Sequence, residues 1–100
     1  GSIISLIKPQ FEAGRNKVGK KGVVRDPDVH REVLINCITS ATKAGLFCTG
    51  ITYSPITGPQ GNIEFFIRLN KEWLSPKLEV EKEVALVVSE AHQQLGGKGI

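Results

Sequence analysis

The chain has 100 residues and a net charge of +3, from 13 lysines and arginines against 10 aspartates and glutamates. This charge is too small on its own to indicate nucleic-acid binding. No apolar run approaches the roughly 18 residues that a membrane-spanning helix needs, and no charged-then-apolar signal segment opens the chain. We therefore expect a cytoplasmic protein without a membrane partner, and pore formation is the least supported function.

The first expected strand covers residues 3–8, an almost continuously apolar run that Pro9 ends. Such a run is typical of a strand buried on both faces of a mostly parallel sheet, and proline cannot donate to a strand ladder. Lys8 closes the run. Because a charge inside a strand costs free energy unless something is gained there, Lys8 is a candidate functional residue.

A basic segment between residues 15 and 25 contains no acidic side chain. Its cations are interleaved with glycines and are Arg15, Lys17, Lys20, Lys21 and Arg25. A flexible basic loop can bind RNA phosphates, although the same composition also fits a solvated surface loop. The position beside Lys8 favours RNA binding. Glu12, between the strand and this loop, is a possible accessory residue that orients Lys8, contacts RNA or caps the loop.

A helix is expected over residues 27–44, with Asp26 as its N-cap, Pro27 at its first position and Gly45 as its left-handed end. Apolar residues recur along it at three- and four-residue spacing, which predicts a stripe packed on a sheet. His30, between acidic neighbours, is expected to be a solvated surface residue, and His92 is interpreted in the same way.

Two further strands are expected at residues 46–53 and 63–69, joined by a loop with two prolines and two glycines. Glu64 opens the last strand and is a second charged candidate. Asn62 sets the entry of that strand or hydrogen-bonds a ribose. A final helix is expected over residues 76–95, where Ser75-Pro76 repeats the cap-then-proline signal.

Three segments carry a resemblance to a known family: IKPQFEAG (residues 7–14), VGKKGVVRDPDVHREVL (residues 18–34) and SPITGPQGNIEF (residues 54–65). They are similar to segments of the TlyA/hemolysin A family, in the same order and at compatible spacing. Members of that family resemble FtsJ-type methyltransferases, which move a methyl group from S-adenosylmethionine to a ribose 2′-hydroxyl of ribosomal RNA.

The resemblance implies an α/β fold, the C-terminal half of a Rossmann-like methyltransferase, with a mixed three-stranded sheet. The strand at residues 63–69 would lie antiparallel between the other two, which brings Lys8 and Glu64 to one sheet edge, close enough for charge coupling. Open α/β sheets bind their ligands at such an edge. In the Lys-Asp-Lys-Glu tetrad of FtsJ-like enzymes, Lys8 matches the second lysine and Glu64 the glutamate, and the other two members would precede Gly1.

The Gly-rich cofactor turn of a Rossmann-like methyltransferase is missing from this sequence. We therefore expect a partial methyltransferase domain, without the cofactor-binding half or an N-terminal RNA-binding module, that does not bind S-adenosylmethionine alone. The full-length parent would be an rRNA (cytidine-2′-O)-methyltransferase acting on ribosomal RNA or a ribosomal subunit. The alternative is a non-catalytic RNA-binding or assembly fragment.

Two further expectations concern association and metals. Without an upstream neighbour, the strand at residues 3–7 would expose an unpaired edge through which the chain self-associates. Cys37 and Cys48 are too far apart for a CxxC pair and are expected to be reduced core residues, with no metal site.

Overall fold

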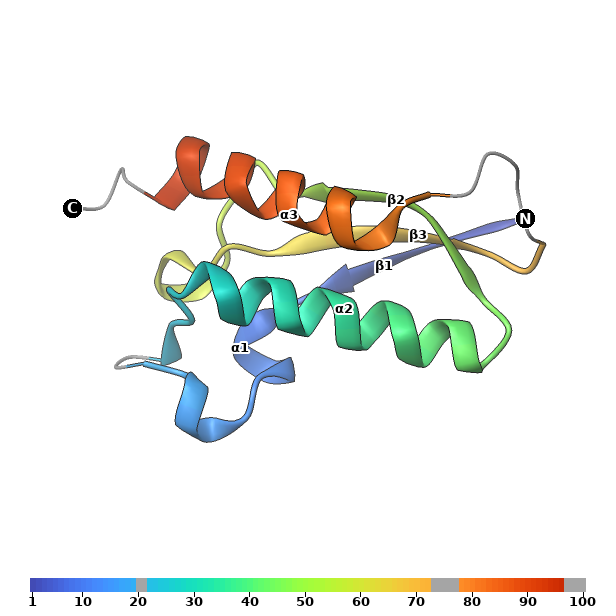
Figure 1. Ribbon diagram of the computed structural model, residues 1–100. Coiled ribbons are helices and arrows are strands. Elements are labelled where there is room, and N and C mark those ends of the chain that lie inside the picture. The colour runs from blue at the N-terminus through green and yellow to red at the C-terminus, as the bar shows by residue number, and fades with distance from the viewer. Residues whose placement is uncertain (20–21, 73–77, 97–100) are drawn as a thin grey trace.

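The computed structural model describes residues 1–19, 22–72 and 78–96 (Figure 1). Three strands form one sheet: β1 (Ser2–Ile7), β2 (Phe47–Tyr53) and β3 (Phe65–Asn70). The order is β1-β3-β2, and β3 runs antiparallel to both neighbours. The expected insertion of the last strand between the two earlier strands is confirmed.

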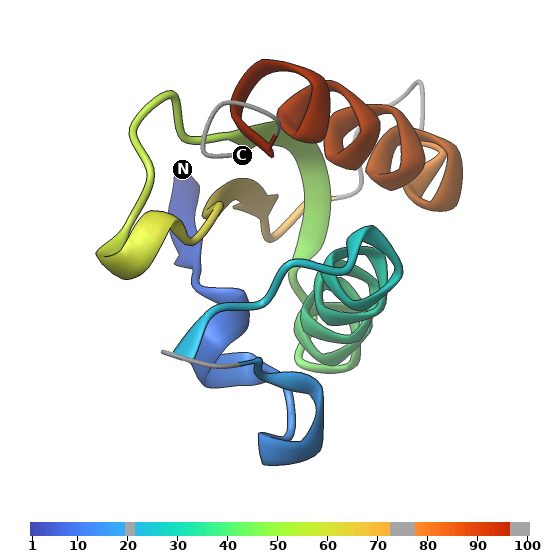
Figure 2. The same ribbon diagram turned by 90° about the vertical axis from the view of Figure 1, so that its left-hand side faces the viewer.

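Two long helices, α2 (Pro27–Lys43) and α3 (Val80–Ala91), cover one face of this sheet (Figure 2). Because side chains alternate along a strand, one set from β3 enters the core and the other faces outward. The buried residues of the sheet that pack against the helices are Ile7, Cys48, Phe65, Ile67 and Leu69. On the opposite face, Ile4 and Arg68 are exposed.

Both cysteines pack as expected, Cys48 in the core and Cys37 half-buried at its margin, and neither forms a disulfide. Burial raises the pKa of both thiols. They are therefore thiols with a packing role.

The ends of α2 follow from its capping residues. The Asp26 side chain accepts a hydrogen bond from Asp28 N at 2.9 Å, and Pro27 occupies the first turn. Gly45 has φ +86°, a conformation that favours glycine, and its N–H donates to Thr42 O at 3.0 Å. The expected helix of residues 27–44 is confirmed to within one residue.

The second long helix is shorter than expected. Leu78 and Glu79 are not helical, so α3 begins at Val80, and it ends at Ala91 before a single π-helical turn (His92–Gly96). The expected start at Ser75-Pro76 lies outside the described residues. Glu79 takes the N-cap position with no side-chain cap bond, which is why sequence signals did not mark this start.

Strand boundaries near the candidate residues also differ. β1 stops at Ile7 because Pro9 opens a one-turn helix, α1 (Pro9–Glu12), that was not expected and that turns the chain away from the sheet. β3 correspondingly starts at Phe65, opposite Ile7. Lys8 and Glu64 thus lie one residue beyond the ladder.

The interpretation of the two histidines as solvated is wrong. His30 is fully buried, with its Nε2 3.0 Å from Val24 O and its Nδ1 2.7 Å from His92 Nε2. The ring also meets Phe65 edge-on, with centroids 5.5 Å apart. Charged sequence neighbours suggested exposure, but His30 lies on the face of α2 that meets α3, so the pair joins the two helices.

Candidate active site

The strand register places three chain positions in a row at one edge of the sheet. Ile7 and Tyr53 are both partners of Phe65. One residue further, Lys8 and Ser54 therefore flank Glu64, and Ser54 N donates to Glu64 O at 2.8 Å. Lys8 keeps an extended backbone, with φ −112° and ψ 98°. The two charged candidates, 56 positions apart in sequence, meet at the edge where open α/β sheets bind ligands.

The Glu64 side chain is buried, with 8% of its residue surface exposed. Its Oε2 accepts a hydrogen bond from Gln10 Nε2 at 2.9 Å. Gly58 packs against the same oxygen so closely that a Cβ at that position would overlap it. Within residues 1–19, 22–72 and 78–96, no cation forms an ion pair with this carboxylate. A buried carboxylate with one neutral donor retains unused acceptor capacity, which suits a site that receives a further donor.

The Lys8 ammonium does not pair with Glu64. It lies over the Phe11 ring, 5.6 Å from the centroid, and Phe11 is 73% exposed. An exposed cation–π contact holds a lysine only weakly. No ion pair joins Lys8 to Glu64, and this edge carries two opposite charges without a charged partner among the described residues.

Gln10 is the residue of this site that sequence reasoning missed. It lies in the short helix α1, whose turn brings its amide back to Glu64. Its position within the same KPQFE run as Lys8 was the available signal. Its Oε1 is buried and has no hydrogen-bond partner in the described part of the chain.

Neither accessory candidate uses its side chain to hydrogen-bond or ion-pair with Lys8 or Glu64 among the described residues. Asn62 is 2% exposed; its Oδ1 accepts from Val24 N at 3.0 Å, and its Nδ2 donates to Gly22 O and Pro59 O. Because both amide protons are used, Asn62 fixes the end of the basic loop against the turn before β3. Glu12 is exposed, and its charge helps to raise the pKa of Cys37 on α2.

One cation of the basic segment forms an ion pair within the protein. Lys17 Nζ lies 2.6 Å from Glu32 Oε1 and 2.7 Å from Glu32 Oε2, which ties the 3-10 turn of residues 15–17 to α2. Arg25 is exposed at the N-terminus of α2. Lys20, Lys21 and the side chain of Arg15 lie outside the described residues.

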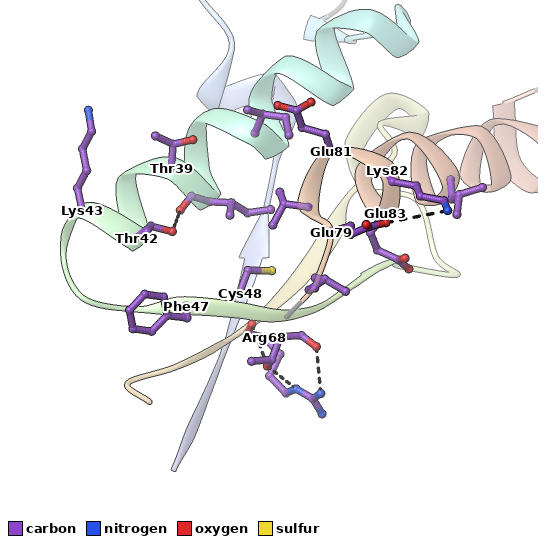
Figure 3. A pocket seen from close by; sticks show the side chains of 16 residues that line it. Thr39, Thr42, Lys43, Phe47, Cys48, Arg68, Glu79, Glu81, Lys82 and Glu83 are labelled. Atoms are coloured by element: carbon purple, nitrogen blue, oxygen red, sulfur yellow. Dashed lines mark hydrogen bonds and ion pairs between the residues drawn. The ribbon is translucent and has the colours of Figure 1, made fainter. Parts of the chain in front are cut away.

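A separate groove lies where β2 begins and β3 ends, the other end of the sheet from Glu64 (Figure 3). Its walls come from α2, β2 and the start of α3, and they include Thr39, Thr42 and Cys48. Lys82 and Glu79, 4.0 Å apart, lie along it. Neither Lys8 nor Glu64 lines this groove, so it is distinct from the candidate site.

Two classes of feature are absent from the described residues. None of their helices is long and apolar enough to cross a membrane. No group of three or more potential metal ligands gathers among them.

Residues 2–71 match the profile of the family described as FtsJ-like methyltransferase. YqxC of Bacillus subtilis, provisionally named an rRNA methyltransferase, is 48% identical over 95% of this chain and 34% of its own length. The 16S/23S rRNA (cytidine-2′-O)-methyltransferase TlyA of Mycobacterium tuberculosis is 39% identical over 70% of this chain and 26% of its own. The chain thus spans about a third of these relatives or less.

Two solved structures superpose on this chain. A protein from Streptococcus thermophilus, provisionally named a hemolysin, superposes with a TM-score of 0.86 and 37% identity, covering 99% of this chain and 35% of that one. A similarly named protein from Lactococcus lactis gives a TM-score of 0.73 and 40% identity, covering 84% of this chain and 41% of that one.

Proposed function

Because the chain belongs to the FtsJ-like methyltransferase family, we propose that it is the C-terminal portion of an enzyme that methylates a ribose 2′-hydroxyl of ribosomal RNA. The observation that carries the proposal is the row of Lys8 and Glu64 at one sheet edge, inside the stretch that matches the family. The TlyA relative, whose name specifies this reaction, supports the substrate class. Such a substrate places the reaction in the cytoplasm.

The chemistry required of these residues is proton transfer and charge compensation. S-Adenosylmethionine supplies an electrophilic methyl group on a sulfonium. Bound to the full-length protein, it would supply the methyl group, and the 2′-hydroxyl that accepts this group would have to give up its proton to a base. Lys8 acts on this oxygen, either as an ammonium that stabilises its developing negative charge or as an amine that takes its proton. Glu64 compensates the positive charge of a lysine and orients it.

The residues present do not themselves form a cofactor cradle. In the described part of the chain, β1 leads into Lys8-Pro9 and β2 into the loop of residues 54–64, and neither strand is followed by a Gly-rich turn that opens a long helix. In the proposed enzyme, this chain therefore supplies residues that act on the ribose hydroxyl, which accepts the methyl group. S-Adenosylmethionine is expected to bind the full-length protein and not these residues alone.

The proposal is tested with the full-length protein, S-adenosylmethionine and ribosomal RNA, followed by digestion to nucleosides and mass spectrometry. A ribose-methylated nucleoside is the expected product. A base-methylated nucleoside would contradict the assignment of the site. RNA binding without any methyl transfer would favour the non-catalytic RNA-binding or assembly function.

The basic segment is proposed to bind RNA phosphates. Replacing Lys20 and Lys21 by glutamine in the full-length protein should weaken RNA binding and reduce the slope of log affinity against log salt by about 0.7 to 0.9 for each lost contact. Lys43→Gln, at the far end of α2, is the control and should leave the slope unchanged. An unaltered slope for the Lys20 and Lys21 variant would show that the segment is a solvated surface loop that does not contact RNA.

The free edge of β1 is proposed to pair with another strand, from a second copy or from the rest of the protein. Ile3, Ile4 and Leu6 are 47%, 62% and 44% exposed on this edge strand. Exposed apolar edges recruit strands, whereas an added lysine opposes such pairing. Light scattering should show the chain's mass rising with concentration, and Ile4→Lys should suppress this rise.

The control for this measurement is Ile56→Lys, which places the same charge on a loop residue that is 77% exposed. It should associate as the unmodified chain does. A chain that stays monomeric at all concentrations would refute pairing between copies.

A further inference from the structure

Gln10 touches the Glu64 carboxylate, but only half of its amide is used. Nε2 donates to Glu64 Oε2 at 2.9 Å, whereas Oε1 is buried without a hydrogen-bond partner among the described residues. Buried amide oxygens in proteins nearly always accept a hydrogen bond, because an unpaired one is costly. An unmet acceptor directly beside a candidate catalytic carboxylate therefore indicates a donor that arrives when the site is complete.

The orientation of this amide is fixed by its neighbour. Turning it over would bring Gln10 Oε1 against Glu64 Oε2, and two acceptors without a proton between them repel. While Glu64 is ionised, Nε2 must face it. Gly58 closes the other side of the carboxylate, since any side chain there would overlap Oε2. The carboxylate is thus held between Gln10 and Gly58.

Lys8 belongs to the same edge and has no acidic partner in the described part of the chain. It follows Ile7, the last residue of the ladder, and Glu64 precedes Phe65, the partner of Ile7, so the two residues adjoin the same end of the strand pair. It is also two residues from Gln10 in sequence. Its ammonium rests over the exposed Phe11 ring, from which it can move at little cost.

We propose that Gln10 is a positioning residue that links Lys8 to Glu64, an inference that rests on the proposed function. Nε2 donates to the Glu64 carboxylate, and Oε1 accepts from the Lys8 ammonium once RNA occupies the site. A direct ion pair would hold Lys8 against Glu64. In the amide-linked arrangement the ammonium contacts Gln10 and not the carboxylate itself. Two of its three protons then remain for the ribose 2′-oxygen.

The test replaces Gln10 by methionine, which has a similar length and no amide, in the full-length enzyme. At a temperature where the variant remains folded, single-turnover methylation of ribosomal RNA should slow by about 10-fold, with the RNA affinity unchanged. The loss should lie in the rate of the chemical step and not in the RNA concentration that half-saturates it, because Gln10 acts through Lys8 and Glu64. Gln93→Met, at an exposed glutamine in the turn after α3, is the control and should change neither quantity.

The double variant Gln10→Met with Lys8→Ala decides whether the two residues act together. If they are linked, it is no slower than Lys8→Ala alone. Multiplied effects, or a loss confined to RNA affinity, would make Gln10 a structural residue and overturn the proposal.

A second readout needs no methyl transfer. The NMR signal of the Lys8 ammonium in the RNA-bound protein should shift in Gln10→Met and stay in place in Gln93→Met, because only the first variant removes the acceptor. An unchanged Lys8 ammonium signal in Gln10→Met would overturn the link, whether or not the enzyme methylates ribose. Absence of ribose methylation by the unmodified enzyme would instead refute the proposed function.

Discussion

Lys8→Ala and Glu64→Ala should each slow single-turnover methyl transfer by about 10² to 10⁴, the usual effect of losing a positioned proton-transfer group. Both residues lie beyond the ladder at the same sheet edge and, in the proposed reaction, act on the hydroxyl that attacks the methyl group. Binding of S-adenosylmethionine should barely change. The measurement is the methylation rate of the full-length enzyme at saturating cofactor, together with a cofactor titration.

Suitable controls are Lys43→Ala and Glu90→Ala, which remove charges of the same kind from exposed positions on α2 and α3. They should react at the unmodified rate. Glu64→Gln retains the shape of the side chain and loses its charge, so it separates packing from electrostatics. An unaffected rate for Lys8→Ala would remove that residue from the mechanism, and a lost cofactor affinity would move it to a different role.

The stability of the chain should rise with pH between about 4 and 6.5 because of the buried pair of histidines. Burial and, to a smaller extent, the neighbouring His92 lower the pKa of His30 from 6.5 to about 4, against weaker opposing effects from the Val24 carbonyl and Asp26. The pKa of His92 is also lowered, by burial and by Arg31. Both rings are therefore neutral in the folded chain at pH 7.

The sign follows from proton binding in the two states. As pH falls below 6.5, His30 binds a proton in the unfolded chain but not in the folded chain. The unfolded state is therefore stabilised relative to the folded state. The contribution of His30 is complete above pH 6.5 and is lost progressively toward pH 4. Between pH 7 and pH 5 the loss is on the order of 2 kcal/mol.

Urea unfolding of the chain at several pH values measures this effect. His30→Gln removes the titrating ring, so the stability difference between the unmodified chain and the variant should shrink as pH falls from 7 to 5. Taking this difference cancels the carboxylates that titrate in both proteins. A difference that is independent of pH would show that His30 is not held neutral by the fold.

Much of the fold could be predicted because local chemistry and global topology agree. Asp26, Pro27 and Gly45 mark the ends of α2 through capping bonds that depend on nearby residues alone. The order β1-β3-β2 came from the family resemblance and is confirmed. The start of α3 could not be predicted, because no side chain caps it and packing against α2 and β2 determines where it begins.

The site could be predicted only in part. Lys8 and Glu64 could be predicted because each is a charged residue at one end of an apolar run, Lys8 after the first strand and Glu64 before the last. Gln10 was missed because α1 is a single turn with a weak sequence signal, and its contact with Glu64 joins residues 54 positions apart. His30 was misplaced for a similar reason: its acidic neighbours describe the outer face of α2, whereas its own face is covered by α3.

The most direct measurement is a structure of the full-length protein with S-adenosylhomocysteine and an RNA that contains the target ribose. The target 2′-oxygen should lie within hydrogen-bond reach of Lys8 Nζ, about 2.6–3.2 Å, with Glu64 and Gln10 beside the ammonium. A ribose bound instead in the groove between α2, α3 and β2, or RNA that does not contact the Lys8 edge, would contradict the proposed active site.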